Sequence, residues 1–240
     1  MSEHVAEKES KQMQKKYKQP TFLSKTWEQI RSLFWALIFA LILRQFVVAN
    51  YTIPTPSMED TLLVGDFLFV NKFIYGMRTP DWIGIPFTDI GFKVPHYRFP
   101  ALDRPETGDI IVFKYPLDPS KEYVKRVIAT GGQTVEIKDN KVFVDGKLFP
   151  DPPGAKHIYS SLFDNLPIKK NFGPVTVPQD HFFVMGDNRD NSADSREWGF
   201  VPWENVVGKP LLIVFSVEKN VPWIRLDKKI RWSRFSRIIR

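Results

Sequence analysis

The sequence contains no cysteine, which excludes a disulfide framework, a thiolate metal site and a cysteine nucleophile. Histidine is scarce, and none of the four histidines stands in a motif-like cluster: His4, His96, His157 and His181. Nothing therefore supports a Ser-His-Asp triad, although residues that are distant in sequence can still meet in a fold. We expect neither a metal site nor a cofactor.

Long hydrophobic runs are also missing. The longest unbroken run, from Leu33 to Leu43, has eleven residues, whereas a bilayer takes about 20. That length is reached only over residues 30–49, with Arg44 near one end, where it can snorkel to the interface. We expect a single transmembrane anchor there, rather than a cleaved signal peptide or a buried core helix. Because lysines concentrate before it, the positive-inside rule places the basic tail 1–29 in the cytoplasm.

Positive charge is in excess only at the two ends of the chain. The formal net charge is +7, yet residues 228–240 carry six Lys or Arg and no acid, and residues 1–31 carry seven against four Glu. Residues 32–227 are left with a net charge of −2. The body of the protein is therefore not a basic surface for nucleic acid, and we expect no nucleic-acid partner.

The body after residue 50 is expected to be mostly β. The chain has 19 prolines and 13 glycines, and no long amphipathic helix follows the hydrophobic segment. Runs of β-branched and aromatic residues predict seven strands, at 66–72, 109–114, 122–128, 134–138, 141–144, 181–185 and 211–217. We expect one domain over 50–227, with a loop-rich, membrane-proximal insertion at about 75–107. A more variable part at about 134–180 contains a hairpin, signalled by Asp139-Asn140.

One serine follows two prolines just after the hydrophobic segment, in Ile53-Pro-Thr-Pro-Ser57. Each proline removes a backbone donor, fixes φ near about −65° and favours extended geometry in the residue before it. A stiff, exposed serine suits a nucleophile, because attack requires the oxygen to be placed accurately at a carbonyl carbon. A turn serine beside prolines has the same appearance, so this stretch alone leaves both interpretations open.

A strand lysine is the alternative to histidine as a base for that serine. Lys125 lies in the strand-like run 122–128, where alternation gives it the same face as Tyr123 and Val127. Burial against an apolar face lowers the pKa of a lysine from about 10.4 toward neutrality, as a Ser-Lys pair requires. A strand lysine more often points to solvent, so the burial of Lys125 stays open.

Five stretches of the chain share their order and spacing with a known family. They lie at 53–58, 65–67, 108–116, 123–126 and 186–196, and the last reads Gly-Asp-Asn-Arg-Asp-Asn-Ser-Ala-Asp-Ser-Arg. With this pattern the chain resembles bacterial type I signal peptidase (leader peptidase) over about residues 30–215. The resemblance implies an antiparallel β-sheet domain of the signal-peptidase type, preceded by one N-terminal transmembrane helix. It places the catalytic domain on the outer (periplasmic) side of the bacterial cytoplasmic membrane.

The resemblance also implies a role for residues in the matching stretches. Ser57 would be the nucleophile, and Lys125 the general base that deprotonates it and later protonates the leaving amine. Ser192 would hydrogen-bond to the lysine and orient it. Asp194 and Arg196 would support the loop as an ion pair.

Substrate contacts follow from the same resemblance. The oxyanion would be met by the Ser57 backbone N–H and the Thr55 hydroxyl, where many family members have Ser-Gly and this chain has Thr55-Pro56. Signal peptides of exported preproteins end in an Ala-x-Ala-like pattern, which requires two small apolar pockets beside an extended peptide. The residues that match the pocket positions are Ile53, Pro54, Met58, Leu62, Leu68, Tyr123 and Val124; each is equally well explained as core packing. The partners implied are preprotein signal peptides and the lipid bilayer.

The C-terminal tail 228–240 is basic and regularly spaced. Arginines recur every third residue, with apolar residues between them: Arg231, Arg234, Arg237 and Arg240, interleaved with Trp232, Phe235 and Ile238. As a helix the tail would be basic on one side and apolar on the other, which suits an anionic membrane surface. A solvated basic terminus is equally compatible with the sequence.

Two other classes of protein compete with a signal peptidase. One is a self-cleaving Ser-Lys regulator of the repressor type, which would need a DNA-binding domain; residues 1–30 show no helix-turn-helix pattern. The other is a non-catalytic, membrane-anchored β-domain in which Ser57 and Lys125 are ordinary residues.

Overall fold

The computed structural model describes the backbone of residues 22–46, 48–79, 82–84, 91–95, 97–157, 171–222 and 224–239. The chain divides into two compact units, Met1–Leu43 and Arg44–Arg240. Most of helix α2 (Phe22–Phe46) belongs to the first unit. The predicted tail 1–29 lies largely outside the described residues.

Helix α2 exposes its apolar side chains. Eight large apolar residues between positions 27 and 41 are more than half exposed: Trp27, Ile30, Leu33, Phe34, Trp35, Leu37, Phe39 and Leu41. Within the described part of the chain, no helix combines the length and the apolar character needed to cross a bilayer. The predicted transmembrane anchor at 30–49 is therefore not confirmed. Residues 48 and 49, the last two of the predicted anchor, belong to strand β1 (Val48–Thr52).

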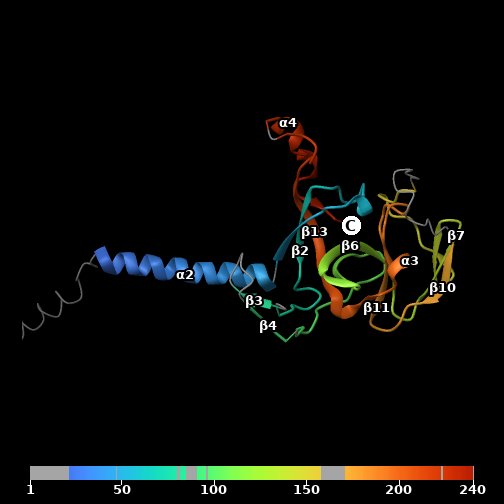
Figure 1. Ribbon diagram of the computed structural model, residues 1–240, viewed down its shortest axis with the longest axis horizontal. Coiled ribbons are helices and arrows are strands. Elements are labelled where there is room, and N and C mark those ends of the chain that lie inside the picture. Colours follow the sequence, from blue (N-terminus) through green and yellow to red (C-terminus); the bar gives the residue numbers. More distant parts are fainter. Residues whose placement is uncertain are drawn as a thin grey trace, which may run out of the picture. The chain divides into compact units, whose positions relative to one another are not determined.

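An eight-stranded sheet forms the centre of the second unit (Figure 1). Seven strands follow the order β1, β2 (Asp66–Asn71), β13 (Val206–Ser216), β5 (Ile110–Tyr115), β6 (Asp118–Thr130), β11 (His181–Met185) and β12 (Val201–Pro202). Strand β14 (Arg237–Ile238) pairs with β13. Neighbours in this sheet are antiparallel. The predicted mostly β, antiparallel domain is confirmed.

Two smaller sheets complete the unit. One has the order β10 (Phe172–Thr176), β7 (Thr134–Lys138), β8 (Lys141–Val144) and β9 (Lys147–Leu148). The predicted hairpin joins β7 and β8, and both of its turn residues have positive φ, 48° at Asp139 and 63° at Asn140. The other pairs β3 (Trp82–Gly84) with β4 (Gly91–Lys93), inside the expected insertion at 75–107. Residues 80–81, 85–90 and 96 of that insertion lie outside the description.

All seven predicted strands are present, but two are longer than expected. Strand β6 begins earlier than predicted, at Asp118, because its first residues pair with β5 in a hairpin. These residues are polar and mostly exposed, so they lack the apolar alternation that predicts a strand. Strand β13 begins at Val206, before the predicted 211–217, and contains Pro210. The pairing of β13 with β2 shifts register just after Pro210, and such an irregularity is where a sheet accepts proline.

One apolar cluster lies under the proline-flanked serine. It is formed by residues of β2, β5, β13 and the segment after β1, among them Ile53, Met58, Leu62, Leu68 and Val112. Met58 follows the serine directly and is only 1% exposed. The serine segment is therefore anchored by its neighbour in the core.

The C-terminal tail is neither of the two forms considered from the sequence. It consists of a short helix α4 (Leu226–Lys229), a 3-10 turn η4 (Trp232–Arg234) and β14. Arg234 is 6% exposed and forms an ion pair with Asp66, which is fully buried. The tail is therefore not one continuous helix. It is not a freely solvated terminus either, because it pairs with β13 and Arg234 binds a buried carboxylate.

Candidate active site

Ser57 is held on a short, stiff segment between β1 and β2. It is the middle residue of the 3-10 turn η1 (Pro56–Met58), and Thr55 before the turn is extended, with φ −124° and ψ 154°. Asn188 clamps this turn from a distant loop: its backbone N–H donates to Ser57 O at 3.1 Å, and its side-chain Nδ2 donates to Pro56 O at 3.2 Å. The stiffening expected from the prolines is thus reinforced by long-range hydrogen bonds.

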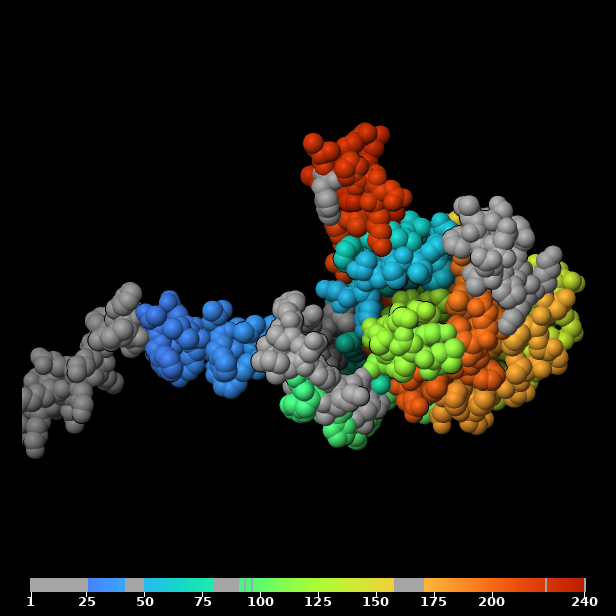
Figure 2. All heavy atoms as spheres, viewed as in Figure 1, coloured from blue at the N-terminus to red at the C-terminus, as the bar shows by residue number. Residues whose placement is uncertain are grey.

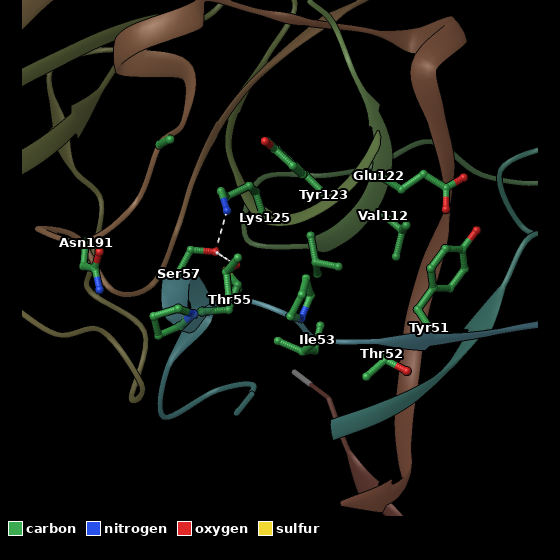
Figure 3. Close-up of a pocket in the computed structure, with 15 residues that line it drawn as sticks. Tyr51, Thr52, Ile53, Thr55, Ser57, Val112, Glu122, Tyr123, Lys125 and Asn191 are labelled. Carbon is green, nitrogen blue, oxygen red and sulfur yellow. Dashed lines mark hydrogen bonds between the residues drawn. The ribbon is translucent and has the colours of Figure 1, made fainter. Parts of the chain in front are cut away.

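Lys125 reaches the serine from strand β6. Its Nζ lies 2.6 Å from Ser57 Oγ, within hydrogen-bonding distance (Figure 3). The Lys125 residue is 4% exposed, and the Tyr123 ring, two residues away on the same face, has its centroid 5.6 Å from Nζ. The structure therefore brings together the two residues that the sequence singled out, and it resolves the open question of whether Lys125 is buried.

Burial sets the protonation of Lys125. Loss of solvation lowers the pKa of Lys125 to about 8, and the carboxylates of Asp194 and Asp187 oppose the shift without cancelling it. A lysine with this pKa is about one-tenth neutral at pH 7. A neutral amine against a hydroxyl oxygen is the arrangement that a general base requires.

The polar loop 186–196 packs against the pair. Arg196 Nε and Nη2 donate to the two oxygens of Asp194 at 2.8 Å each, so the expected ion pair is present. Asp194 is fully buried and also caps helix α3 (Ser195–Trp198), and it accepts from the Gly186 N–H at 3.1 Å. The pair fixes the loop rather than contacting the serine directly.

A second buried ion pair joins this loop to strand β6. Arg126, next to Lys125, donates from Nε and Nη2 to Asp187 at 2.9 and 2.8 Å, and Asp187 is fully buried. Thr61 also donates to Asp187, at 2.6 Å. Arg126 and Asp187 both lie in the matching stretches, but their pairing is not visible in the sequence, because nothing local links positions 61 residues apart. The sequence shows only that two of the matching stretches contain residues of opposite charge, Arg126 and Asp187.

Ser192 differs from its expected role. It is 4% exposed, and its hydroxyl has no hydrogen-bond partner among the described residues, so the expected bond to Lys125 is not formed. The loop nevertheless runs very close to Ser57 at Gly186. A Cβ placed on Gly186 would lie 2.3 Å from Ser192 Oγ and 2.4 Å from Ser57 O. Only glycine allows this approach.

Thr55 stands on the solvent side of the serine. Its Oγ1 lies 3.4 Å from Ser57 Oγ, and its side chain is exposed. The hydroxyl is thus free to reach a bound carbonyl oxygen beside the nucleophile. Pro56 in place of glycine does not turn the Thr55 hydroxyl away from the serine.

A pocket of about 270 Å³ opens beside the pair, with a mainly apolar wall (Figure 3). Five of the seven predicted pocket residues line it: Ile53, Pro54, Met58, Tyr123 and Val124. Leu62 and Leu68 do not; both are fully buried in the cluster beneath. The sequence did not predict several other lining residues, among them Tyr51, Thr52, Val112, Glu122, Asn191 and Ala193. Val112 could have been found from its pairing with Val124 across β5 and β6, had the register been known.

Comparisons with known proteins identify the family of this chain. A family model described as signal peptidase, peptidase S26, matches residues 26–215. A signal peptidase I of Aquifex aeolicus is 35% identical, over 79% of this chain and 84% of that protein. One of Pseudomonas aeruginosa is 36% identical, over 78% of this chain and 71% of that protein. A crystal structure of a signal peptidase I from Enterococcus faecalis is 32% identical and covers 45% of this chain and 97% of that chain, with a TM-score of 0.38. The chain belongs to the signal peptidase family, peptidase S26, and is an enzyme of that family.

Proposed function

We propose that this signal peptidase is a serine endopeptidase in which Ser57 is the nucleophile and Lys125 the general base. The observation that carries the proposal is the 2.6 Å approach of a buried Lys125 Nζ to Ser57 Oγ. The burial gives the amine a pKa of about 8, close enough to neutrality for proton transfer. A buried Ser-Lys pair favours a catalytic function over a non-catalytic domain. A self-cleaving regulator would share this chemistry, and the match to the signal peptidase family argues against it.

The chemistry divides into acylation and deacylation. Neutral Lys125 Nζ takes the Ser57 hydroxyl proton while Ser57 Oγ attacks the carbonyl carbon of the scissile bond. The Ser57 N–H and the Thr55 hydroxyl stabilise the oxyanion, and protonated Lys125 then gives its proton to the leaving amine. The Ser57 ester that remains is hydrolysed by water, which Lys125 deprotonates in turn. Asp194 and Arg196 support the loop that excludes solvent from the amine.

The proposed substrates are signal peptides of exported preproteins, cut after an Ala-x-Ala-like sequence. Strand β1 is an edge of the sheet, and β6 pairs with β11 only through residues 126–130, so the segment of β6 that carries Lys125 is not covered by β11. A peptide that enters in extended form can pair with the edge formed by Tyr51 to Thr55. The apolar pocket beside the pair would then receive the side chains before the cut, and the preference for alanine is what the family resemblance implies.

We also propose that the enzyme works at the outer face of the cytoplasmic membrane, with α2 in contact with lipid. Eight large exposed apolar side chains on one helix support this, since such surfaces are interaction sites. The lysines before α2 favour a cytoplasmic N-terminus. Protease added to spheroplasts is expected to degrade residues 50–240 and to leave the membrane-bound N-terminal part. Release of the intact chain by alkaline carbonate would contradict attachment.

Cleavage of a purified preprotein in detergent tests the substrate proposal. The mature N-terminus, identified by mass spectrometry, is expected directly after the second alanine. Leucine at the last position or at the third-last position before the cut is expected to abolish cleavage, whereas leucine between them is the matched control. Equal cleavage of all three variants would show that the pocket does not select small side chains.

A further inference from the structure

The C-terminal tail from Leu226 to Ile239 returns to the domain next to the segment that carries Ser57 (Figure 2). Strand β14 pairs with β13, and the Ile239 N–H donates to Leu211 O at 2.9 Å. Ile239 packs against the apolar cluster that contains Ile53 and Met58, the residues that flank the serine segment. The family model ends at residue 215, so the comparison with the family does not cover this tail.

Arg234 makes the central contact of the tail. Its Nε and Nη2 donate to the two carboxylate oxygens of Asp66 at 3.0 and 2.6 Å. Nη2 also donates to the backbone carbonyl of Thr61 at 3.0 Å. One buried guanidinium therefore ties the first residue of β2 to the turn that precedes it.

Thr61 and Asp66 belong to a closed loop that contains Ser57. The ends of the loop meet at Ile53, whose N–H donates to Asp66 O at 2.9 Å and whose carbonyl accepts from the Gly65 N–H at 3.0 Å. Inside the loop, the Leu62 N–H donates to Met58 O at 2.6 Å. A displacement at Thr61 is thus passed to the turn of Ser57 through adjacent backbone bonds.

The same threonine also reaches the Lys125 side of the site. Its hydroxyl donates to Asp187 at 2.6 Å, and Asp187 holds Arg126, the neighbour of Lys125 on β6. Thr61 is therefore fixed from two directions, by Arg234 through its carbonyl and by Asp187 through its hydroxyl.

From these contacts we propose that Arg234, through Asp66 and Thr61, is a positioning residue for the Ser57–Lys125 pair. The inference rests on the proposed function of the two residues. Arg234 does not line the peptide pocket, so its loss acts on the chemical step rather than on substrate binding. A misplacement of about 1 Å at a reacting atom can cost about 10²-fold in rate.

The deciding variant is Arg234→Lys, because it keeps a positive charge against buried Asp66. Lysine presents a single ammonium in place of the planar fork and cannot serve Asp66 and the Thr61 carbonyl in the same geometry. Arg234→Gln removes the charge and leaves the buried Asp66 carboxylate without its cationic partner, which can unfold the protein. Its activity is therefore interpreted only if the variant protein is folded. Arg237→Lys is the matched control, since Arg237 lies in the same tail with an exposed side chain. Each purified variant is assayed for kcat and KM, well below its own Tm.

We expect Arg234→Lys to lower kcat about tenfold or more while KM stays within about twofold, since positioning affects only the transition state. The Arg237→Lys control is expected to match the wild type. A lower Tm with wild-type kcat would show a purely structural role and overturn the proposal, as would a higher KM at unchanged kcat. Ser57→Ala, assayed in parallel, separates the two claims. If it stays active, the proposed function fails; if it is inactive and Arg234→Lys is normal, only this inference fails.

Discussion

At the scale of single residues, the site depends on the cost of burying one amine. Lys125 lies almost entirely out of solvent, beside the Tyr123 ring and against the hydroxyl of Ser57. Desolvation penalises the charged ammonium, and this lowers the pKa of Lys125 to about 8. The same burial therefore destabilises the folded protein and makes the base available. The effect on the base is tested by the pH dependence of cleavage, and the effect on stability by the unfolding of Lys125→Met.

The first residue-scale prediction concerns the pH dependence of cleavage. Only neutral Lys125 accepts the Ser57 proton, so kcat/KM is expected to rise about tenfold per pH unit below pH 8 and to level off above it. Initial rates on a peptide substrate between pH 6 and 10 measure the profile. A midpoint near pH 6.5 would instead indicate a histidine base and contradict the assignment.

The second residue-scale prediction concerns stability. The pKa of Lys125 is lower in the folded state than in the unfolded state, so the unfolded chain binds the proton more tightly. The resulting loss of folding stability is fully present below about pH 8. Lys125→Met is therefore expected to raise the free energy of unfolding by about 3 kcal/mol at pH 7. The extra stability of Lys125→Met over the wild type should decrease between pH 8 and 10.5 and be absent above pH 10.5. Urea unfolding of both proteins at pH 7 and pH 10.5 measures it; an advantage independent of pH would contradict burial of a charged amine.

At the scale of elements, the site forms where three segments from distant parts of the chain meet. The turn η1 supplies Ser57, strand β6 supplies Lys125, and the loop after β11 closes over both. At Gly186 that loop passes so close to Ser57 that an added Cβ would meet the Ser57 carbonyl. The loop is therefore tightly constrained at this one point.

Gly186→Ala tests that constraint. The added methyl group would meet Ser192 Oγ and the Ser57 carbonyl at distances far inside van der Waals contact, so the loop or the turn must move. We expect kcat to fall about 10²-fold because Ser57 is displaced from Lys125. Gly146→Ala is the control: it has open space around it, and its φ of 75° costs only local strain. Equal activity of both variants would show that the loop is not pressed against the serine.

The elements predicted from the sequence are those with a local signal. Alternating apolar residues located strands such as β2 and β7, and turn chemistry located the Asp139-Asn140 hairpin. Strand β14 and the fold of the tail could not be found this way, since they depend on pairing with β13 and on the buried Asp66 carboxylate. The Arg126–Asp187 pair was missed for the same reason. Ser57 and Lys125, the proposed nucleophile and base, were singled out within a family pattern, and the comparisons confirm the family.

At the scale of the whole molecule, the chain consists of a helical unit and a catalytic unit with its own core. Among the described residues, the members of the three apolar clusters all belong to Arg44–Arg240. The Ser57–Lys125 pair, the loop 186–196 and the contact of Arg234 with Thr61 also lie within that unit. The helical unit is thus not required for the geometry of the site.

Removal of residues 1–43 is therefore expected to leave a folded peptidase. On a short soluble peptide, its kcat should stay within about twofold of the full chain, because a domain with its own core folds independently. On preproteins inserted in vesicles, its rate should fall, since the enzyme is no longer confined to the surface where the cleavage site emerges. Circular dichroism and the two assays measure this. Loss of activity on the soluble peptide despite a native spectrum would show that α2 contributes to the site.

The central claim is that Ser57 and Lys125 together cut the preprotein. Its most direct test is cleavage of one purified preprotein by the wild type, Ser57→Ala and Lys125→Met, each shown by circular dichroism to be folded. The account predicts that the wild type cuts after the Ala-x-Ala sequence and that both variants are inactive. Cleavage by a folded Lys125→Met protein at the wild-type rate would contradict it, because the serine would then be activated by another group.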